Sequence, residues 1–334
     1  MRNTERRKDY EYSGVLAEIC AAFIDEKRAV GYIYNSEAKK LSEFSRFTLA
    51  YDIPMNTLTE EVVKAWIAKK PTDSYKNRAA KYSLVKQLGE YMSRLGYSAY
   101  ITGFDDIGKC KKTFTPYIFT HTEISKFFTA ADSLEYKAKS IAPRRHLIMP
   151  VLFRMLYCCG LRVSEACELH GDEVDLENGV LIVRKSKFSK TRYVPMSKEL
   201  TIVCVKYNET RLVGKGDDDW FFIAPDGGRY DNRTIYGTFR ELLLKSGISH
   251  GGKGKGPRVH DFRHTFAVHC LQRWVERGAN PTTVLPRLTA YLGHCSFSST
   301  EEYLRMTAEI FPQISEIMQK QFGYIIPIGK DVAE

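Results

Sequence analysis

The sequence predicts a mainly α protein with a small β-hairpin, an α+β fold divided into two domains. Apolar residues recur at helical spacing along most of the chain, whereas residues 180–195 alternate with the period of strands. The length of 334 residues corresponds to about two domains. A basic stretch from Tyr97 to Tyr117 carries glycine and proline but no apolar period. We therefore expect a helical domain with its linker over residues 1–112 and a second domain over residues 113–334.

The first domain is predicted to contain four helices. Their apolar stripes lie in residues 15–30, in residues 41–49, between Thr57 or Thr59 and Pro71, and in residues 74–95, followed by Gly96 at the C′ position. Packing in a helical core explains these stripes. The lysines and arginines outside them could contact a nucleic-acid backbone or simply face solvent, and the sequence does not distinguish the two.

The second domain is predicted to begin with two longer helices. Thr120 and Glu123 form a capping box at the start of the first of them. Pro143 has the place of an N1 residue in the next helix, which ends at Gly160. Pro150 lies inside this second pattern, so we expect either a kink or a later start.

A short helix and a β-hairpin follow. Ser164 or a neighbour is expected to cap the short helix and to place Arg162 at its mouth, where backbone N–H groups favour an anion. Residues 180–184 and 192–195 predict two strands joined by a lysine-rich tip. Further helices are expected over residues 197–207 and 233–244.

The C-terminal third combines a helix, a turn and a tail. The Gly/Lys-rich loop over residues 246–256 lacks the strand and the Gly-Lys-Ser/Thr ending of a phosphate-binding loop, which excludes a nucleotide site of that type. A helix is expected to run from His260 towards a turn with His294, and Tyr303 falls on the next short helix. Residues 310–318 predict an amphipathic helix that packs on its own domain or docks on a neighbouring copy.

The composition favours a polyanionic partner. The net charge is +10, which is typical of proteins that bind nucleic acid, although a basic surface can also serve solubility. The eight cysteines are scattered and form no CxxC pair, a pattern that fits a reducing compartment. The charged N-terminus does not resemble a signal peptide, and no apolar run is long enough to span a bilayer. We expect a cytoplasmic protein without a membrane partner.

The residue types between His260 and Tyr303 suit an attack on a phosphodiester. His260 and Arg263 are three positions apart, so on a helix both side chains leave the same face. Arg263, together with Arg162, offers planar forks of donors that match the non-bridging phosphate oxygens. His260 and His294 add donors or handle a proton. Tyr303 would supply the nucleophile, activated by a base or a positive pocket.

Two further residues complete this candidate site. A departing 5′ oxygen needs a proton, and Lys187 at the hairpin tip is placed to act as the general acid. Glu165 follows Arg162 by one turn and would orient that guanidinium rather than react. The chemistry requires no cofactor and no metal, and the histidines lack the spacing of a zinc site.

The order of these residues resembles that of the tyrosine site-specific recombinases, the phage integrase family, which includes the Xer-type recombinases and Cre. The matching residues are Cys159-Gly160-Leu161-Arg162-Val163-Ser164-Glu165, Lys187 ahead of Pro195, His260-x-x-Arg263-His264, Leu292-Gly293-His294 and Tyr303. The N-terminal part more loosely resembles the family's helical, SAM-like core-DNA-binding domain. The hairpin tip departs from the family's glycine-flanked lysine. Lys185 or Lys190 could therefore be the acid, although the spacing to Pro195 favours Lys187.

The resemblance implies a catalytic domain that cuts and rejoins DNA. Tyr303 would become covalently joined to a 3′ phosphate, with an activating set of Arg162, Lys187, His260, Arg263 and His294 and with Glu165 in support. The resemblance also implies double-stranded DNA as partner, a homotetrameric synapse and a Holliday junction, without ATP or divalent metal. The tail after Tyr303 would reach a neighbouring subunit. We favour integration or excision of a mobile element as the biological role.

Four other interpretations remain open. Xer-type resolution of chromosome dimers uses the same chemistry, as does a type IB topoisomerase-like enzyme that relaxes DNA without synapsis. A non-catalytic DNA-binding module would have no need of Tyr303. A metal nuclease built on the histidines would lose its activity in chelator.

Overall fold

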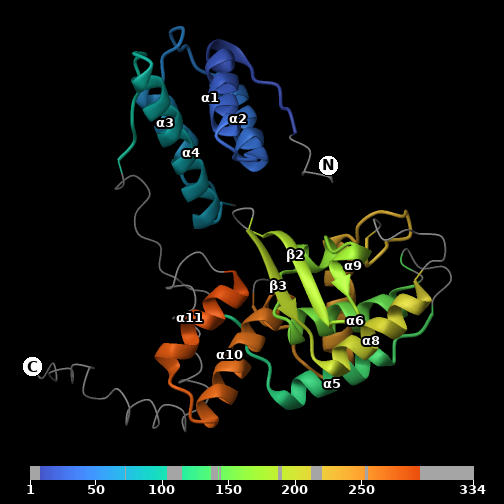
Figure 1. Cartoon of the computed structure of the whole chain (residues 1–334). Coiled ribbons are helices and arrows are strands. Elements are labelled where there is room, and N and C mark those ends of the chain that lie inside the picture. Colours follow the sequence, from blue (N-terminus) through green and yellow to red (C-terminus); the bar gives the residue numbers. More distant parts are fainter. Residues whose placement is uncertain are drawn as a thin grey trace, which may run out of the picture. The chain divides into compact units, whose positions relative to one another are not determined.

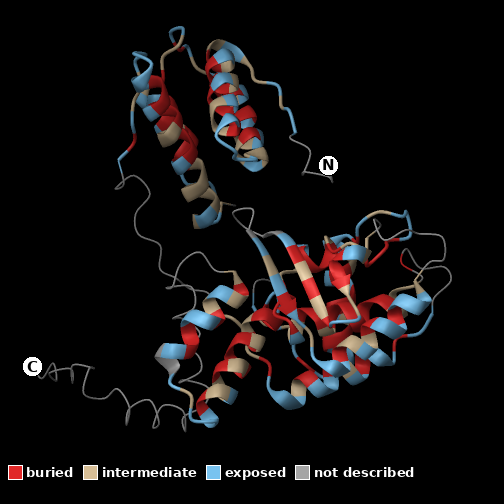
Figure 2. Cartoon of the chain, in the orientation of Figure 1, coloured by how far each residue is buried: buried red, intermediate tan, exposed pale blue. Residues whose placement is uncertain are grey.

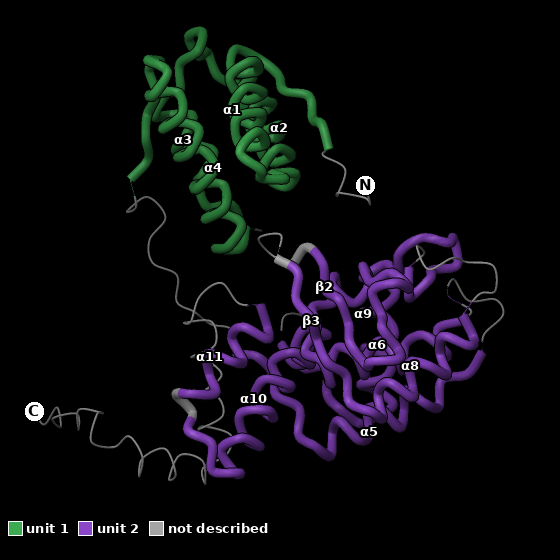
Figure 3. The backbone as a smooth tube through the Cα atoms, viewed as in Figure 1, with its two compact units in different colours: residues 1–113 green, residues 114–334 purple. Residues whose placement is uncertain are grey.

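A computed structural model of the chain describes residues 8–71, 73–103, 115–136, 142, 144–186, 190–211, 220–252 and 255–293. The chain divides into two compact units, residues 1–113 and residues 114–334 (Figure 3). The described parts are mainly helical and include one small antiparallel sheet (Figure 1). The predicted fold class is therefore confirmed. Among the described helices, none is long and apolar enough to cross a bilayer.

The described residues of the first unit form four α-helices and a short 3₁₀ turn. They are η1 (Gly14–Leu16), α1 (Ala17–Ala29), α2 (Asn35–Thr48), α3 (Glu60–Ile67) and α4 (Tyr75–Arg94). Thr59 and Ser74 cap α3 and α4 by accepting hydrogen bonds from the backbone N–H groups of Val62 and Asn77. The helices bury their apolar faces against one another, as the alternation of buried and exposed residues shows (Figure 2).

The second unit places helices around a sheet. Its elements in the described residues are α5 (His121–Asp132), α6 (Arg145–Cys158), α7 (Val163–Cys167), η3 (Gly171–Glu173), β1 (Val174–Asp175), β2 (Val180–Ser186), β3 (Lys190–Pro195), α8 (Lys198–Thr210), α9 (Asn232–Lys245), α10 (Asp261–Glu276) and α11 (Pro281–Leu292). The capping box predicted at Thr120 and Glu123 is present at the start of α5.

The sheet has the strand order β1-β2-β3, and both pairs are antiparallel. Leu181 lies opposite Val194, and both are buried on the inner face. Ile182 lies opposite Tyr193, which is exposed on the outer face. β2 and β3 form the hairpin that the sequence predicts. β1 was not predicted, because a strand of two residues is too short to establish an alternation.

An aromatic cluster fixes the start of α10. Phe262 is fully buried and its ring stacks on that of Phe119, with centroids 5.2 Å apart. The rings of Phe127 and Phe239 pack against Phe262 edge-on, at 5.1 and 5.6 Å. Aromatic pairs in these arrangements contribute beyond their buried area. Because Arg263 follows Phe262 directly, this packing also fixes where the Arg263 side chain leaves the helix.

Two predicted helix boundaries differ from the structure. α6 begins at Arg145 and contains Pro150, so Pro143 is not its N1 residue. Pro150 lies inside α6 even with this start. The N-cap position of α7 is Arg162, whose side chain makes no capping hydrogen bond, and Ser164 lies inside the helix. A neighbouring carboxylate replaces the usual Ser or Asp cap here, because the side chain of Glu165 accepts the Arg162 backbone N–H.

The segment from His260 to Leu292 forms two helices instead of one continuous helix. α10 ends at Glu276, and α11 begins at Pro281, a residue well suited to the first turn of a helix. The two helices pack through a separate apolar cluster that includes Leu271, Leu285 and Leu288. The hairpin of helices brings the end of α11 back towards the start of α10.

Gly160 joins α6 to α7 in a left-handed conformation that strains any residue with a side chain. Its φ is +59°, and a Cβ atom would lie 2.5 Å from Cδ1 of Phe266. We expect Gly160→Ala to lower the free energy of unfolding by about 1–2 kcal/mol for the left-handed backbone and by about a further 1–3 kcal/mol for the clash. Urea denaturation measures this change.

Gly247→Ala is the matched control. Gly247 lies in the same unit with φ +69°, but nothing lies within 4 Å of its would-be Cβ. Only the backbone cost applies, so the loss of stability is expected to be smaller than in Gly160→Ala. Equal losses in the two variants would show that the Phe266 contact does not constrain the turn.

Candidate active site

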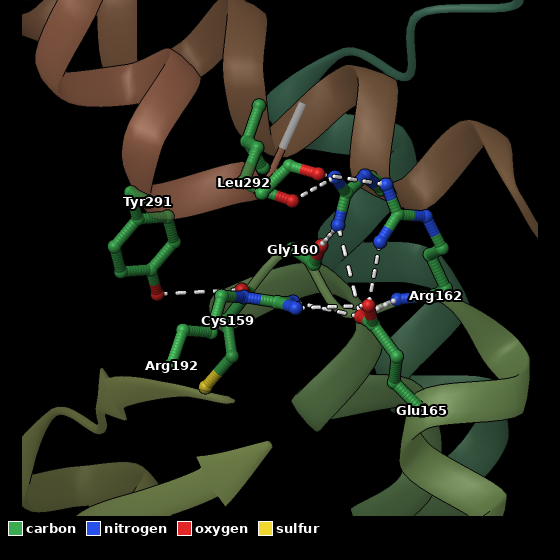
Figure 4. A network of polar contacts seen from close by, with 9 residues as sticks. Cys159, Gly160, Arg162, Glu165, Arg192, Tyr291 and Leu292 are labelled. Carbon is green, nitrogen blue, oxygen red and sulfur yellow. Dashed lines mark hydrogen bonds and ion pairs between the residues drawn. The ribbon is translucent and has the colours of Figure 1, made fainter. Parts of the chain in front are cut away.

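A buried carboxylate, Glu165, lies at the centre of the candidate site (Figure 4). Its oxygens accept hydrogen bonds from the guanidinium groups of Arg162 and Arg192, and Nη1 of Arg263 lies 3.8 Å away. Burial raises the pKa of Glu165, but the hydrogen bonds and charges of the arginines outweigh it and lower the pKa to about 2. Glu165 is therefore ionised at neutral pH.

Arg162 is held at the start of α7 by two contacts with the same carboxylate. Its backbone N–H donates to Oε2 of Glu165 at 2.8 Å, and its Nη1 donates to Oε1 at 2.6 Å. Nη2 donates to the carbonyl oxygen of Gly293 at 3.3 Å. The side chain keeps 25% of its surface exposed, so part of the guanidinium remains available to an anion. Glu165 thus orients Arg162 as the sequence suggests.

Arg263 is almost completely buried, with 1% of its surface exposed. Its Nη1 donates to the carbonyl oxygen of Gly160 at 2.7 Å, and its Nη2 donates to that of Leu292. Both carbonyl groups lie at helix C-termini, those of α6 and α11, where the helix dipole favours a cation. Arg263 therefore ties together three segments that are distant in the sequence.

His260 stands directly before α10 and is exposed to solvent. Its ring lies edge-on to that of His264, with centroids 4.9 Å apart. Loss of hydration and then the charges of three arginines lower the pKa of His260 to about 4; these arginines are Arg263, Arg258 and Arg162. His260 is neutral at pH 7 and can donate one hydrogen bond.

Arg192 also belongs to this cluster, and the sequence analysis did not predict this. It lies on β3, and its Nη1 and Nη2 donate to the two oxygens of Glu165 at 2.9 and 2.7 Å (Figure 4). Its position in a strand gave no indication of a partner. The signal that could have found it is the inward register, since Arg192 and the buried Val194 lie on the same face of β3.

Three of the predicted site residues lie outside the described part of the chain: Lys187, His294 and Tyr303. The backbones of Lys185 and Lys190 belong to β2 and β3, but their side chains are not described. Gly293 precedes His294 and is bound by Arg162. The structure brings Arg162, Glu165, His260 and Arg263 together.

Tyr291 is a second tyrosine near these arginines. Its hydroxyl donates to the carbonyl oxygen of Cys159 at 3.3 Å, and its ring stacks on that of Phe266. Burial, followed by the neighbouring Cys159 thiol, raises the pKa of Tyr291. This phenol therefore keeps its proton and serves as a structural donor.

The arrangement has more positive than negative charge. Glu165 is a single carboxylate among Arg162, Arg192 and Arg263, and the nearby Asp261 is paired with Arg258. A phosphate group would supply the missing negative charge, and guanidinium groups bind phosphate through paired hydrogen bonds. The cluster thus has the charge and the donors of a site for a phosphate group.

Comparison with known proteins identifies its family. The phage integrase family matches residues 118–309, which is more than half of the chain and includes the whole candidate site. The chain belongs to this family. It is a tyrosine recombinase, an enzyme of the class that cleaves and rejoins DNA.

Some relatives match most of the chain, and others, such as a tyrosine recombinase XerA of Pyrococcus horikoshii, match 58% of it. A putative integrase/recombinase of Sinorhizobium fredii is 27% identical over 305 residues, which cover 90% of this chain and 96% of the relative. The Tn1549 transposon integrase, solved in complex with a circular intermediate DNA, has a TM-score of 0.62 at 20% identity and covers 85% of this chain and 94% of its own. The XerH site-specific recombinase, solved bound to its palindromic difH substrate, has a TM-score of 0.63 at 16% identity, with coverages of 93% and 91%. At these identities the two structures support the fold.

Removing the central carboxylate should destabilise the protein in a pH-dependent way. At pH 7 we expect Glu165→Gln to lower the free energy of unfolding by roughly 3–5 kcal/mol, because buried arginines lose their counter-ion. The folded pKa of Glu165, about 2, lies below the ordinary value of 4.5. The stabilisation by the ionised group is therefore complete above pH 4.5 and is lost as the pH falls towards 2. Urea denaturation at steps from neutral to acid pH measures the difference.

Glu60→Gln serves as the control for this experiment. Glu60 forms an exposed i,i+4 ion pair with Lys64 on α3, so its loss should cost about 0.2–0.5 kcal/mol. A difference between wild type and Glu165→Gln that stays constant through the acid range would contradict the assigned ionisation of Glu165.

Proposed function

We propose that this protein is a site-specific DNA recombinase that cleaves each strand through a 3′-phosphotyrosyl intermediate at Tyr303. The observation that carries the proposal is the cluster of Arg162, Arg263 and His260 around one buried carboxylate, in a chain of the phage integrase family. The excess positive charge of this cluster fits a phosphate whose oxygens gain charge in the transition state.

Arg162 and Arg263 would bind the non-bridging oxygens of the scissile phosphate. Arg162 is the more accessible of the two and would make the first contact, whereas Arg263 acts from a buried position. His260 is neutral at pH 7, so it would act as a hydrogen-bond donor. His294 would complete this set. Glu165 supports the arginines without touching DNA.

The reaction exchanges one ester bond for another. The Tyr303 oxygen forms a bond to phosphorus and passes its proton to a base, a role for which His294 is available, while the bond from phosphorus to the 5′ oxygen breaks. Lys187 would give that oxygen its proton, with Lys185 or Lys190 as the alternatives. Because the bond energy is kept in the phosphotyrosyl linkage, religation by the reverse step needs no ATP and no metal.

Recombination requires two duplexes and, we propose, four copies of the chain. Double-stranded DNA would lie against both units, the first as the core-DNA-binding domain over residues 1–112 and the second as the catalytic domain over residues 113–334. Strands would exchange through a Holliday junction, and the tail after Tyr303 would dock on a neighbouring copy. The transposon integrase and XerH, which share the fold, were solved in complex with DNA, and this supports DNA as the partner.

We propose integration or excision of a mobile element as the biological role. The name of the Sinorhizobium fredii relative, an integrase/recombinase, supports this choice. Xer-type resolution of chromosome dimers is the alternative, and relatives named tyrosine recombinase XerA favour it. A type IB topoisomerase-like enzyme would differ from both, because it would relax a supercoiled plasmid that lacks a recombination site.

The proposed nucleophile predicts a covalent adduct. Duplexes that bind the protein are first selected from a random library, and the selected site is nicked so that the cleaved strand cannot religate. Wild type, incubated with this DNA in chelator, is expected to give a protein–DNA band on a denaturing gel. Tyr303→Phe should give none, because it lacks the attacking oxygen.

Tyr291→Phe is the matched control. Tyr291 lies near the same arginines but its hydroxyl is a donor to Cys159, so this variant should still form the adduct. An adduct with Tyr303→Phe, or tight binding of wild type without any adduct, would contradict the proposal. Relaxation of plasmid without the selected site would favour the topoisomerase-like activity instead.

A further inference from the structure

Arg192 makes the most extensive contact with Glu165. Both terminal nitrogens of the guanidinium donate to the carboxylate, one to each oxygen, at 2.9 and 2.7 Å (Figure 4). The two side chains are 11% and 7% exposed, so solvent screens this pair little. A paired fork of this kind fixes both the position and the plane of the carboxylate.

The same carboxylate is shared with the arginines that are expected to bind DNA. Oε1 of Glu165 accepts from Nη1 of Arg162, and Oε2 lies 3.8 Å from Nη1 of Arg263. A lone buried carboxylate would draw both guanidinium groups onto itself and would cancel much of their charge. Because Arg192 neutralises Glu165, the remaining positive charge stays with Arg162 and Arg263.

Arg192 also lies against the turn that precedes His294. A Cβ atom on Gly293 would lie 3.5 Å from Nη1 and 3.6 Å from Cδ of Arg192. Arg162 donates to the carbonyl oxygen of the same glycine. The arginine of β3 therefore contacts two parts of the site at once, the carboxylate on α7 and the end of α11.

We propose that Arg192 is a positioning residue for strand cleavage, which acts through Glu165 to keep Arg162 and Arg263 charged and oriented towards the scissile phosphate. This inference rests on the proposed function. Arg192 itself would not contact DNA, because both of its terminal nitrogens donate to the carboxylate and only 11% of its side chain is exposed.

The inference predicts a loss of cleavage that a second substitution reverses. In Arg192→Gln the unneutralised Glu165 should draw in Arg162 and Arg263, and the single-turnover rate of adduct formation should fall by about 10²-fold, the effect of misplaced groups. The affinity for the selected duplex should change little. In the double variant Arg192→Gln/Glu165→Gln the carboxylate charge is also absent, so the rate should recover above that of Arg192→Gln alone.

Arg184→Gln is the matched control. Arg184 lies on the neighbouring strand β2 and forms ion pairs with Glu173 and Asp172 at 3.0 and 3.8 Å, away from Glu165. This variant should cleave at the wild-type rate. Arg192→Lys keeps the charge but not the paired hydrogen bonds, so its cleavage rate should fall between those of wild type and Arg192→Gln. If Arg192→Gln does not fold, Arg192→Lys still tests the inference.

Several outcomes would overturn the inference. Unchanged cleavage in both Arg192→Gln and Arg192→Lys would show that the pair does not position the site. Arg192 would instead be a direct phosphate ligand if Arg192→Gln bound DNA more weakly and the double variant did not recover cleavage. The slope of log affinity against log salt would then be reduced by about 1. The proposed function fails separately, when wild type gives no adduct or Tyr303→Phe retains it. In that case the role of Arg192 in cleavage falls as well.

Discussion

The interaction on which the site depends is the contact of one buried carboxylate, Glu165, with guanidinium groups from three segments of the second unit. Burying a charge costs several kcal/mol unless a partner compensates it. Here the carboxylate accepts a hydrogen bond from the Arg162 backbone N–H at the start of α7. It also links that helix to β3 and to α10 through Arg192 and Arg263. One side chain thus serves as a helix cap, as an ion-pair partner and as the organiser of the cations.

The buried Arg263 is stabilised by a different device, the carbonyl groups at two helix ends. It binds the oxygens of Gly160 and Leu292, where α6 and α11 terminate. The close approach requires the left-handed turn at Gly160, which has no room for a side chain beside Phe266. Helix dipoles and backbone oxygens hold the cation without adding carboxylates, which leaves its charge for an anion.

The shared Glu165 carboxylate and the carbonyl groups that bind Arg263 together explain why the site carries a net positive charge. If each arginine had its own carboxylate, the cluster would be neutral and would have little attraction for a phosphate. With one carboxylate and several carbonyl groups, the arginines are oriented but not neutralised. Tyrosine recombinases cleave and rejoin DNA, and we propose the DNA backbone as the anion that this charge binds. The pKa of His260, lowered mainly by loss of hydration and then by the same charges, makes that residue a neutral donor.

Local sequence was sufficient to predict the helices with clear caps, such as α5 behind Thr120 and Glu123, and the hairpin with its alternating residues. It was less successful where a boundary depends on tertiary contacts, as at Arg145 and at the Arg162 cap, and it missed the two-residue strand β1.

The sequence alone determined which residue types are present and in which order, and that order was enough to recognise the family and to group Arg162 with Arg263. Only the tertiary structure decided that Arg192 shares Glu165 with them and that Arg263 is held by carbonyl groups. Periodicity reports which face of an element is buried. Ion pairs between distant segments depend on how those faces pack against each other. The two partners meet only in the folded protein, so the local sequence contains no pattern that reveals them.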